Sequence, residues 1–494
     1  AVDMPMSVLL GKTPKMHRDA EHAEPVKMET DKAVDTRKAL YEVLAHPTVG
    51  SKKFLITIGD RTVGGMTVRD QMVGPWQVPV ADAAVTAVSF EEFKGGAMAM
   101  GEKTPIAVSN AAAASRMAIG EALTNLVSVD VNLDRIILSA NWMGACGVKG
   151  QDAALYDGVS AASSFCQELG VSIPVGKDSL SMKTSWKDQA GEAKTVVSPV
   201  SLVVSAAAPV YDIRNNLLPM FAETVRDSSL LLIDLGHGKD RLGGSVYSQV
   251  TQRFDSVTPD MEDPKELKKF LELIRSLSAK GAILAYHDRS DGGLAAALCE
   301  MMFASHVGVE IVADALVSKD RTLNQALFNE ELGAVIQVAR GRAAEVERDF
   351  EAAGMGWSLK YLGNLNQDDH LNIYLEGKCV LSEDRVDLQK AWNEVSWQIA
   401  RMRDNPECAD SEYELISDKH NGGLVLTMGF DPEENLAAPF INTGVRPKVA
   451  ILREQGVNSQ NEMASAFLQA GFDAVDVHMT DLLEGRAKLA DFVG

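Results

Sequence analysis

The sequence is poor in cysteine and has no long apolar run. Its five cysteines in 494 residues lie far apart, at positions 146, 166, 299, 379 and 408, and none belongs to a Cys-x-x-Cys pair. This spacing argues against a disulfide framework or a zinc site and favours a reducing compartment. No run approaches the ~20 continuous apolar residues of a membrane helix, and residues 1–10 lack the pattern of a signal peptide. We therefore expect a cytoplasmic protein with no membrane partner.

Basic residues are also scarce relative to acidic ones. The chain has 48 Lys and Arg against 69 Asp and Glu, which gives a formal net charge of -21 at pH 7. This charge repels polyphosphate backbones unless a local basic patch overrides it, so we expect no nucleic-acid partner. The apolar content of 46% is enough for large buried cores, and the length predicts roughly three domains.

Short apolar runs alternate with helical patterns along most of the chain. Strands are expected at 54–58, 84–90, 136–139, 196–206, 229–234, 283–286, 309–312 and 333–338. Helices are expected at 111–127, 153–169, 264–279 and 293–304. The alternation predicts a mixed α/β (α+β) protein with two domains of comparable size.

Changes in composition predict where these domains begin and end. Residues 12–34 are polar and contain helix-breaking prolines, which indicates a connecting segment. Residues 386–402 keep a helical spacing of apolar residues before an acidic, loop-rich linker, and residues 449–477 predict a βαβ unit. The expected divisions are 1–50, 51–215, 216–385, 386–446 and 447–494.

Both ends of the chain look cut. Residues 6–10 are expected to form a buried strand with no preceding turn, and another strand is expected to begin at 492–494. We therefore expect this chain to be an excerpt of a longer protein.

Asp82 is the first candidate functional residue. It follows Val78-Pro79-Val80-Ala81, where a loop enters an otherwise apolar strand. A buried carboxylate without a partner is costly, and Mg²⁺ offsets that cost because it prefers carboxylate and amide oxygens together with phosphate. Taken alone, Asp82 is equally well explained as a residue that forms a turn.

Two further segments carry oxygen ligands of the same kind. Glu121 and Asn125 lie four residues apart on an Ala-rich helix and therefore share a face, although a solvated pair is the simpler interpretation. In the segment 287–293 a strand ends at Asp288, and a helix then begins whose amides can bind an anion. Ser290 could donate to a phosphate, but helix capping explains both residues equally well. His287 could act as a base, although a structural role is more common for a histidine at a strand end.

A glycine-rich segment at 236–245 lacks the Lys-Ser or Lys-Thr pair that a Walker phosphate loop needs after its second glycine. Backbone amides that approach a phosphate and a plain turn both remain open for it.

Four longer motifs occur in one order along the chain, at 59–65, 74–82, 174–179 and 287–293. Together they resemble the large, single-chain form of phosphoribosylformylglycinamidine synthase, over essentially the whole chain. The resemblance implies the second half of the synthetase region, a two-domain unit similar to aminoimidazole ribonucleotide synthetase. Residues 449–459 resemble the start of the family's glutaminase domain, a flavodoxin-like class I glutamine amidotransferase.

This resemblance implies an ATP-dependent ligase of purine biosynthesis. Such an enzyme converts formylglycinamide ribonucleotide, glutamine and ATP to formylglycinamidine ribonucleotide, glutamate, ADP and phosphate. It implies Mg²⁺ and ATP or ADP as ligands, with the upstream synthetase half and the rest of the glutaminase domain as partners. The implied metal ligands are Asp82, Glu121, Asn125 and Asp288. Ala81 and Ser290 match nucleotide-contacting positions, and Lys52 is a weaker candidate.

The resemblance leaves the role of this nucleotide site open. The site either holds the ATP that turns over or keeps a nucleotide as a structural element, and we favour the structural role. None of the five cysteines stands at a strand-to-helix elbow, so we expect the glutaminase Cys, His and Glu outside this chain. A small-molecule kinase of the thiamine monophosphate kinase type is a further alternative, but it leaves the glutaminase-like end unexplained.

Overall fold

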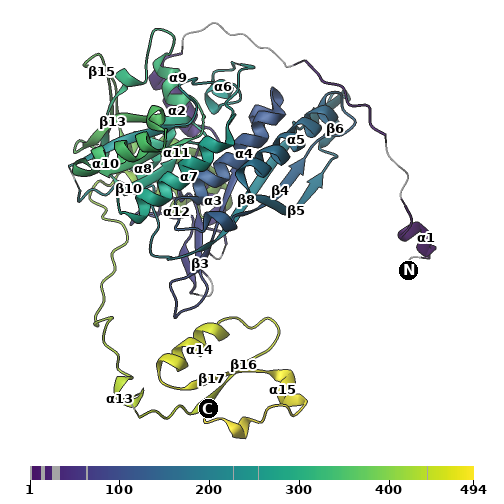
Figure 1. The fold of residues 1–494 in the computed structure, drawn as a ribbon, viewed down its shortest axis with the longest axis vertical. Helices are drawn as coiled ribbons and strands as arrows, with labels where there is room; N and C mark the ends of the chain where they lie inside the picture. The colour runs from purple at the N-terminus through teal and green to yellow at the C-terminus, as the bar shows by residue number, and fades with distance from the viewer. Residues whose placement is uncertain are drawn as a thin grey trace.

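Two mixed sheets with helices packed against them form the main body of the protein, and a small αβ unit lies apart from it at the end of a linker (Figure 1). The computed structural model describes residues 3–12, 17–24, 34–59, 61–62, 65–225, 227–253, 255–441 and 443–494. The expectation for the segment 12–34 and for the motif at 59–65 therefore lies partly outside the described residues.

The first sheet has six strands in the order β1-β2-β3-β8-β4-β5. Their bounds are Thr67–Arg69, Ala84–Ala87, Gly95–Glu102, Ser201–Val210, Ile137–Met143 and Ser172–Ser179 in that order. Helices α4 (Ala111–Leu126) and α5 (Gln151–Leu169) lie against one another, and α4 packs on β3 and β8. The small residues of α4 allow a close approach, because a Cβ on Gly101 of β3 would lie 2.0 Å from the Ala118 carbonyl oxygen. The two chain segments β6 (Lys183–Lys187) and β7 (Ala193–Val197) form a separate hairpin.

The described residues leave the other face of the first sheet largely open. Met98 of β3 and Ile137 of β4 both pair with Ala207 of β8, so their side chains share this face. These two side chains are 56% and 49% exposed, and Val175 on the edge strand β5 is 62% exposed. An apolar sheet surface of this kind is typical of an interface.

The second sheet has seven strands in the order β10-β12-β9-β13-β11-β14-β15. Their bounds are Ile283–Asp288, Gly333–Ala339, Ser228–Asp234, Leu359–Asn366, Gly308–Val312, His370–Leu375 and Lys378–Asp384 in that order. Alternate residues of β9 enter two different cores, Leu231 with helix α7 (Pro264–Ala279) and Leu232 with helix α8 (Gly293–Ser305). Both faces of this sheet are therefore covered.

Helix α11 (Arg385–Arg403) packs against α8 and α2 (Thr36–Ala45), with Trp392 buried among them. Helix α12 (Pro406–Glu414) follows and shows that the expected loop-rich linker begins with a second helix. We call the part of the chain that carries the six-stranded sheet, residues 67–210, the first unit, and the part that carries the seven-stranded sheet, residues 228–384, the second unit. The linker beyond α12 contacts the first unit, since Leu424 N donates to Pro75 O and Trp76 Nε1 donates to Asn421 O. The remaining described helices are α1 (Met6–Leu9), α3 (Lys53–Ile56), α6 (Val246–Val250), α9 (Leu323–Phe328), α10 (Arg340–Ala352), α13 (Ala438–Ile441) and α15 (Met479–Leu483).

The C-terminal unit is a βαβ arrangement. Strands β16 (Lys448–Arg453) and β17 (Asp473–His478) pair in parallel, and helix α14 (Gln460–Gln469) connects them. Val493 N donates to Lys448 O, and Ala450 N donates to Gly494 O, so the last residues lie beside β16 as a further extended segment. The predicted βαβ unit is confirmed.

Two strand predictions are wrong, and a third, at 196–206, covers the end of β7 and the first part of β8, two strands that belong to different sheets. Residues 6–9 form the exposed helix α1 rather than a buried strand, and residues 53–56 form helix α3 rather than a strand. In α3, Phe54 N donates to Ser396 Oγ of α11, so a tertiary contact decides the structure of the segment. A short apolar run does not by itself distinguish a strand from one turn of helix.

Among the described residues, no helix is both long and apolar enough to cross a bilayer.

Candidate functional site

Asp82, His287 and Asp288 meet between the two sheets. Asp82 lies in the loop just before β2, and the other two residues end β10. His287 Nδ1 lies 2.7 Å from Asp82 Oδ1 and 3.8 Å from Asp288 Oδ1. One ligand atom from each residue lies within 4.8 Å of the others, close enough to share one cation. The side chains are 1%, 8% and 6% exposed, respectively.

Two carboxylate oxygens in this cluster have no partner. Asp82 Oδ2 and Asp288 Oδ2 are buried and accept no hydrogen bond from the residues that the structure describes. Burial and the neighbouring Asp82 raise the pKa of Asp288 well above its usual value. Burial opposes the charge of His287, but Asp82 and Glu300 outweigh it and raise the pKa of the imidazole. Buried, unpartnered carboxylate oxygens fit a hard divalent cation such as Mg²⁺.

Glu300 supports His287 from the opposite side. His287 Nε2 lies 2.8 Å from Glu300 Oε2, and Trp392 Nε1 donates to Glu300 Oε1 at 3.2 Å. A carboxylate behind a histidine fixes the orientation of the ring, as partners behind metal sites commonly do. Glu300 was not predicted from the sequence. A signal for a buried functional carboxylate is nevertheless there, because Glu300 is the only charged residue in the apolar run 293–304.

Glu121 and Asn125 lie on one turn of α4, close to the three-residue cluster but outside it. Glu121 Oε2 accepts a hydrogen bond from Glu102 N at 2.6 Å, and its Oε1 accepts one from Ser290 Oγ. Asn125 Nδ2 donates to Glu121 O at 3.1 Å. The structure therefore brings Glu121 and Ser290 together, and Asp82 and Asp288 together, as two adjoining groups.

Lys103 is a buried cation that the sequence analysis missed. It is 2% exposed, and its Nζ donates to Asp291 Oδ1 at 2.6 Å and to Ser290 Oγ at 3.3 Å. Glu330 Oε2 lies 3.8 Å from the same nitrogen. Burial, partly offset by Lys103, raises the pKa of Glu330 to about 7. No pattern around Lys103 distinguishes it from a surface lysine.

Lys52 and Ala81 are the two remaining nucleotide candidates, and Lys52 is the weaker of them. Lys52 Nζ donates to Thr48 O at 2.9 Å and Gly50 O at 2.5 Å, and burial lowers its pKa. Ala81 directly precedes Asp82, and its N donates to Gln71 O at 3.3 Å.

A cavity of about 700 Å³ opens beside Lys103 between the two units. Asp291 and Glu330 line it near Lys103, and Ile106 and Val246 supply apolar walls.

The glycine-rich segment 236–245 begins with a turn around the carboxylate of Asp234, the last residue of β9. Gly236 N and Gly238 N donate to the two oxygens of Asp234 at 3.1 and 2.9 Å. Asp234 thus occupies the place that an anion would take among these amides. Of the two alternatives for this segment, the plain turn fits the structure.

Three family models match the chain. They are described as the FGAR-AT PurM_N-like domain over residues 51–209, the C-terminal domain of AIR synthase related proteins over 228–376, and the CobB/CobQ-like glutamine amidotransferase domain over 446–494. This order places synthetase-type and glutaminase-type domains on one chain. The chain belongs to the phosphoribosylformylglycinamidine synthase family. The family and the fold class expected from the motifs are confirmed.

Solved structures agree with the fold of this chain. One is "T. maritima PurL complexed with FGAR", with a TM-score of 0.52 and 10% identity over 72% of this chain and 54% of that chain. Another is "Structure of PurLQS from Thermotoga maritima", with a TM-score of 0.52 and 12% identity over 78% of this chain and 53% of that chain. The chain thus spans about half the length of these relatives.

Proposed function

We propose that this chain is part of an ATP-dependent amidotransferase of purine biosynthesis. The complete enzyme would convert formylglycinamide ribonucleotide, glutamine and ATP to formylglycinamidine ribonucleotide, glutamate, ADP and phosphate. Membership of the family supports this reaction, as does the similarity of the fold to a T. maritima protein solved in complex with FGAR. The glutaminase-like match at 446–494 favours it over a small-molecule kinase.

One observation carries the proposal of a magnesium–nucleotide site in this portion. Asp82 Oδ2 and Asp288 Oδ2 are buried without partners in a single cluster. Mg²⁺ would neutralise these carboxylates and bind phosphate oxygens. Glu121 and Asn125 of α4 are the further proposed ligands. Glu121 accepts a hydrogen bond from Ser290 Oγ, and Asn125 Nδ2 donates to Glu121 O one turn along the helix.

Ser290, Ala81 and Lys52 are the proposed nucleotide contacts. Ser290 lies in the turn before α8, where its hydroxyl would suit a phosphate oxygen at the start of the helix. Lys52 and Lys103 supply positive charge on the same side of the site. We favour ATP or ADP as a tightly held structural element here, with turnover in the upstream half, because the proposed metal ligands Asp82 and Asp288 are almost completely buried.

The test is Asp288→Asn in the complete enzyme, with the exposed Asp320→Asn as the matched control. A structural site predicts less bound nucleotide after purification and a lower melting temperature, with modest change in turnover of the folded enzyme. A catalytic site predicts loss of turnover with unchanged stability. If nucleotide content, stability and turnover all match the control, neither role survives.

We also propose that the open face of the first sheet binds the upstream synthetase half. Its apolar residues include Met98, Met100 and Ile137, each about half exposed in this chain. A neighbouring domain of the same protein would cover such a surface.

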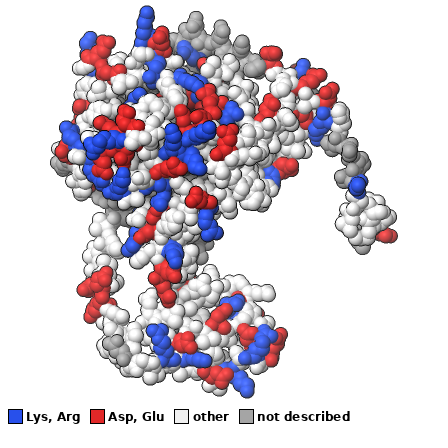
Figure 2. Space-filling model, viewed as in Figure 1, with Lys and Arg blue, Asp and Glu red and all other residues white. Residues whose placement is uncertain are grey.

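We also propose a cytoplasmic location and no nucleic-acid partner. All five cysteines are free, which fits a reducing, cytoplasmic setting. On the face drawn in Figure 2, Lys and Arg lie interspersed with Asp and Glu, which gives little support to a nucleic-acid partner. Ammonia would come from hydrolysis of the substrate glutamine to glutamate, catalysed by the rest of the glutaminase domain.

A further inference from the structure

Helix α4 faces the second unit with three residues spaced four apart. Arg116 Nε and Nη2 donate to the two carboxylate oxygens of Asp260 at 2.8 and 2.6 Å. One helical turn later, a Cβ on Gly120 would lie only 2.1 Å from Leu332 Cδ1. A further turn on, Thr124 O accepts a hydrogen bond from Tyr286 Oη at 2.6 Å. Residues at this spacing share one face, so α4 contacts the second unit along a single stripe.

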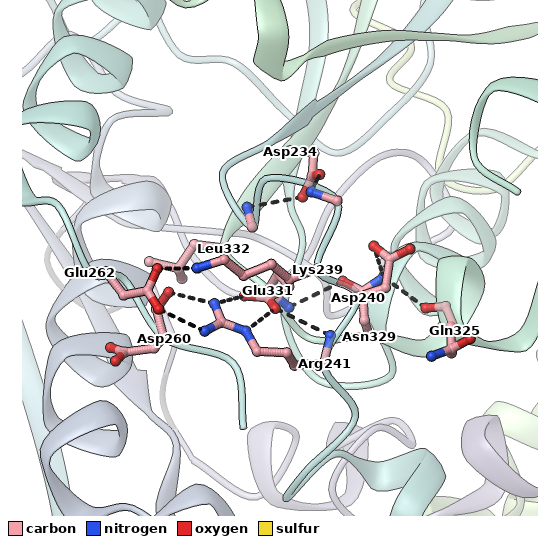
Figure 3. Close-up of polar contacts among 12 residues, drawn as sticks. Asp234, Lys239, Asp240, Arg241, Asp260, Glu262, Gln325, Asn329, Glu331 and Leu332 are labelled. Atoms are coloured by element: carbon pink, nitrogen blue, oxygen red, sulfur yellow. Dashed lines mark hydrogen bonds and ion pairs between the residues drawn. The ribbon is translucent and has the colours of Figure 1, made fainter. Parts of the chain in front are cut away.

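The contact at Arg116 continues into a buried polar network (Figure 3). Arg241 Nη2 donates to Asp260 O at 2.9 Å, and the same guanidinium binds both oxygens of Glu331 at 2.6 and 2.9 Å. The Glu331 side chain is 1% exposed. Figure 3 shows Arg241 between the segments that carry Asp260 and Glu331. Arg241 therefore holds these two segments together.

The network ends at the turn that carries Asp288 and Ser290. Glu331 O and Leu332 O accept hydrogen bonds from Arg289 at 2.7 and 3.1 Å. Arg289 stands between Asp288 and Ser290 in the chain. A continuous set of hydrogen bonds thus runs from α4 to the proposed nucleotide turn.

We propose that Arg116, Asp260 and Arg241 form a clamp that positions Glu121 and Asn125 of α4 relative to Asp288 and Ser290. This inference rests on the proposed magnesium–nucleotide site. Each residue of a helix rises 1.5 Å, so a small slip of α4 moves its ligands by a large fraction of a metal–oxygen distance of about 2.1 Å. The clamp residues touch neither metal nor nucleotide, and they act only through the position of α4.

An isolated surface ion pair would have little effect of this kind. The Arg116–Asp260 pair differs because it is bidentate and its side chains are only 23% and 11% exposed. It also joins two separate units, whereas the bidentate pair Arg214–Asp212 lies within one short segment. The second pair therefore provides a matched control.

The experiment measures ADP binding by calorimetry to the full chain after its copurified nucleotide has been removed. It is done with MgCl₂ and with EDTA, for the wild type, Arg116→Gln, Arg116→Lys and the control Asp212→Asn. Arg116→Gln is expected to weaken Mg²⁺-dependent ADP binding about tenfold, the smaller effect seen for partners behind metal ligands. Binding in EDTA is expected to stay unchanged, because the clamp acts on the metal ligands. Arg116→Lys keeps the charge without the bidentate geometry, so its Mg²⁺-dependent affinity for ADP is expected to lie between those of the wild type and Arg116→Gln. Asp212→Asn is expected to match the wild type.

The possible outcomes separate the two proposals. Unchanged Mg²⁺-dependent binding in Arg116→Gln overturns the clamp, as does an equal loss in Asp212→Asn or an equal loss in EDTA. If Arg116→Gln does not fold, the same comparison is made with Arg116→Lys, and wild-type binding in that variant overturns the clamp. A wild-type chain that binds no ADP with Mg²⁺ overturns the proposed site and the clamp together.

Discussion

Glu330 joins three elements through one buried carboxylate. Its Oε1 accepts hydrogen bonds from Val246 N and Gly292 N, both at 2.9 Å, and its Oε2 faces Lys103. Burial raises its pKa to about 7, above the value of about 4.3 in an unfolded chain. The folded protein therefore binds a proton that the unfolded chain has already released between these two values.

This pKa difference predicts a pH dependence of stability. The contribution of Glu330 is fully present below about pH 4.3 and is lost as the pH rises through about 7. Glu330→Gln stays neutral at every pH, so the wild type should lose free energy of unfolding relative to this variant between about pH 4.5 and about pH 7.5. Urea unfolding at several pH values, with the exposed Glu347→Gln as control, measures the difference. Parallel curves for Glu330→Gln and wild type would contradict the prediction.

Residue types and their context decided which parts of the site could be predicted. Asp82 and Asp288 were singled out because each carboxylate lies where an apolar strand meets a loop, and the structure places both in one cluster. Lys103 was missed because only the tertiary fold surrounds it with Asp291 and Glu330. Ligation by the proposed metal residues stays a prediction.

At the scale of elements, the close packing of α4 depends on Gly120. A methyl group there would lie 2.1 Å from Leu332 Cδ1 in a buried interface, so one side must shift. Gly120→Ala is expected to lower the free energy of unfolding by about 1–3 kcal/mol, as overpacked cores do.

The double variant Gly120→Ala, Leu332→Ala checks this cause. Leu332→Ala creates room for the new methyl group, so the double variant is expected to be more stable than the sum of the two single effects. Chemical denaturation of all four proteins gives the coupling. Simple additivity would show that the two positions do not compete for space.

Helices with complete local signals were predicted best. Helix α7 spans Pro264–Ala279 as predicted, because Asp263 caps it, proline opens it and its apolar residues recur on one face. The wrong strand at 54–58 had no such signals, and its outcome depended on contact with α11. The order of strands in both sheets could not be predicted, because pairing joins residues distant in the chain.

At the scale of the whole molecule, the open face of the first sheet predicts different behaviour in this chain and in the complete protein. Met100 is 59% exposed here, so Met100→Glu is expected to change the free energy of unfolding of this chain by less than about 0.5 kcal/mol. In the complete protein the same charge would be buried against the upstream half and would weaken that contact.

Co-purification with a separately expressed upstream half measures the contact. Met402→Glu on α11 is the matched control, because Met402 is 80% exposed and lies away from the sheet face. Met100→Glu is expected to reduce recovery of the partner and Met402→Glu to leave it unchanged. Equal recovery in both variants would count against this face as the interface.

The contact between Gly120 and Leu332 also has a consequence for the history of this protein. Because the two residues fill one space, neither position can enlarge without loss unless the other shrinks. Selection therefore acts on the pair rather than on each residue alone. Across related sequences, a larger residue at position 120 should accompany a smaller one at position 332. The substitution that shrinks position 332 should have arisen before the one that enlarges position 120.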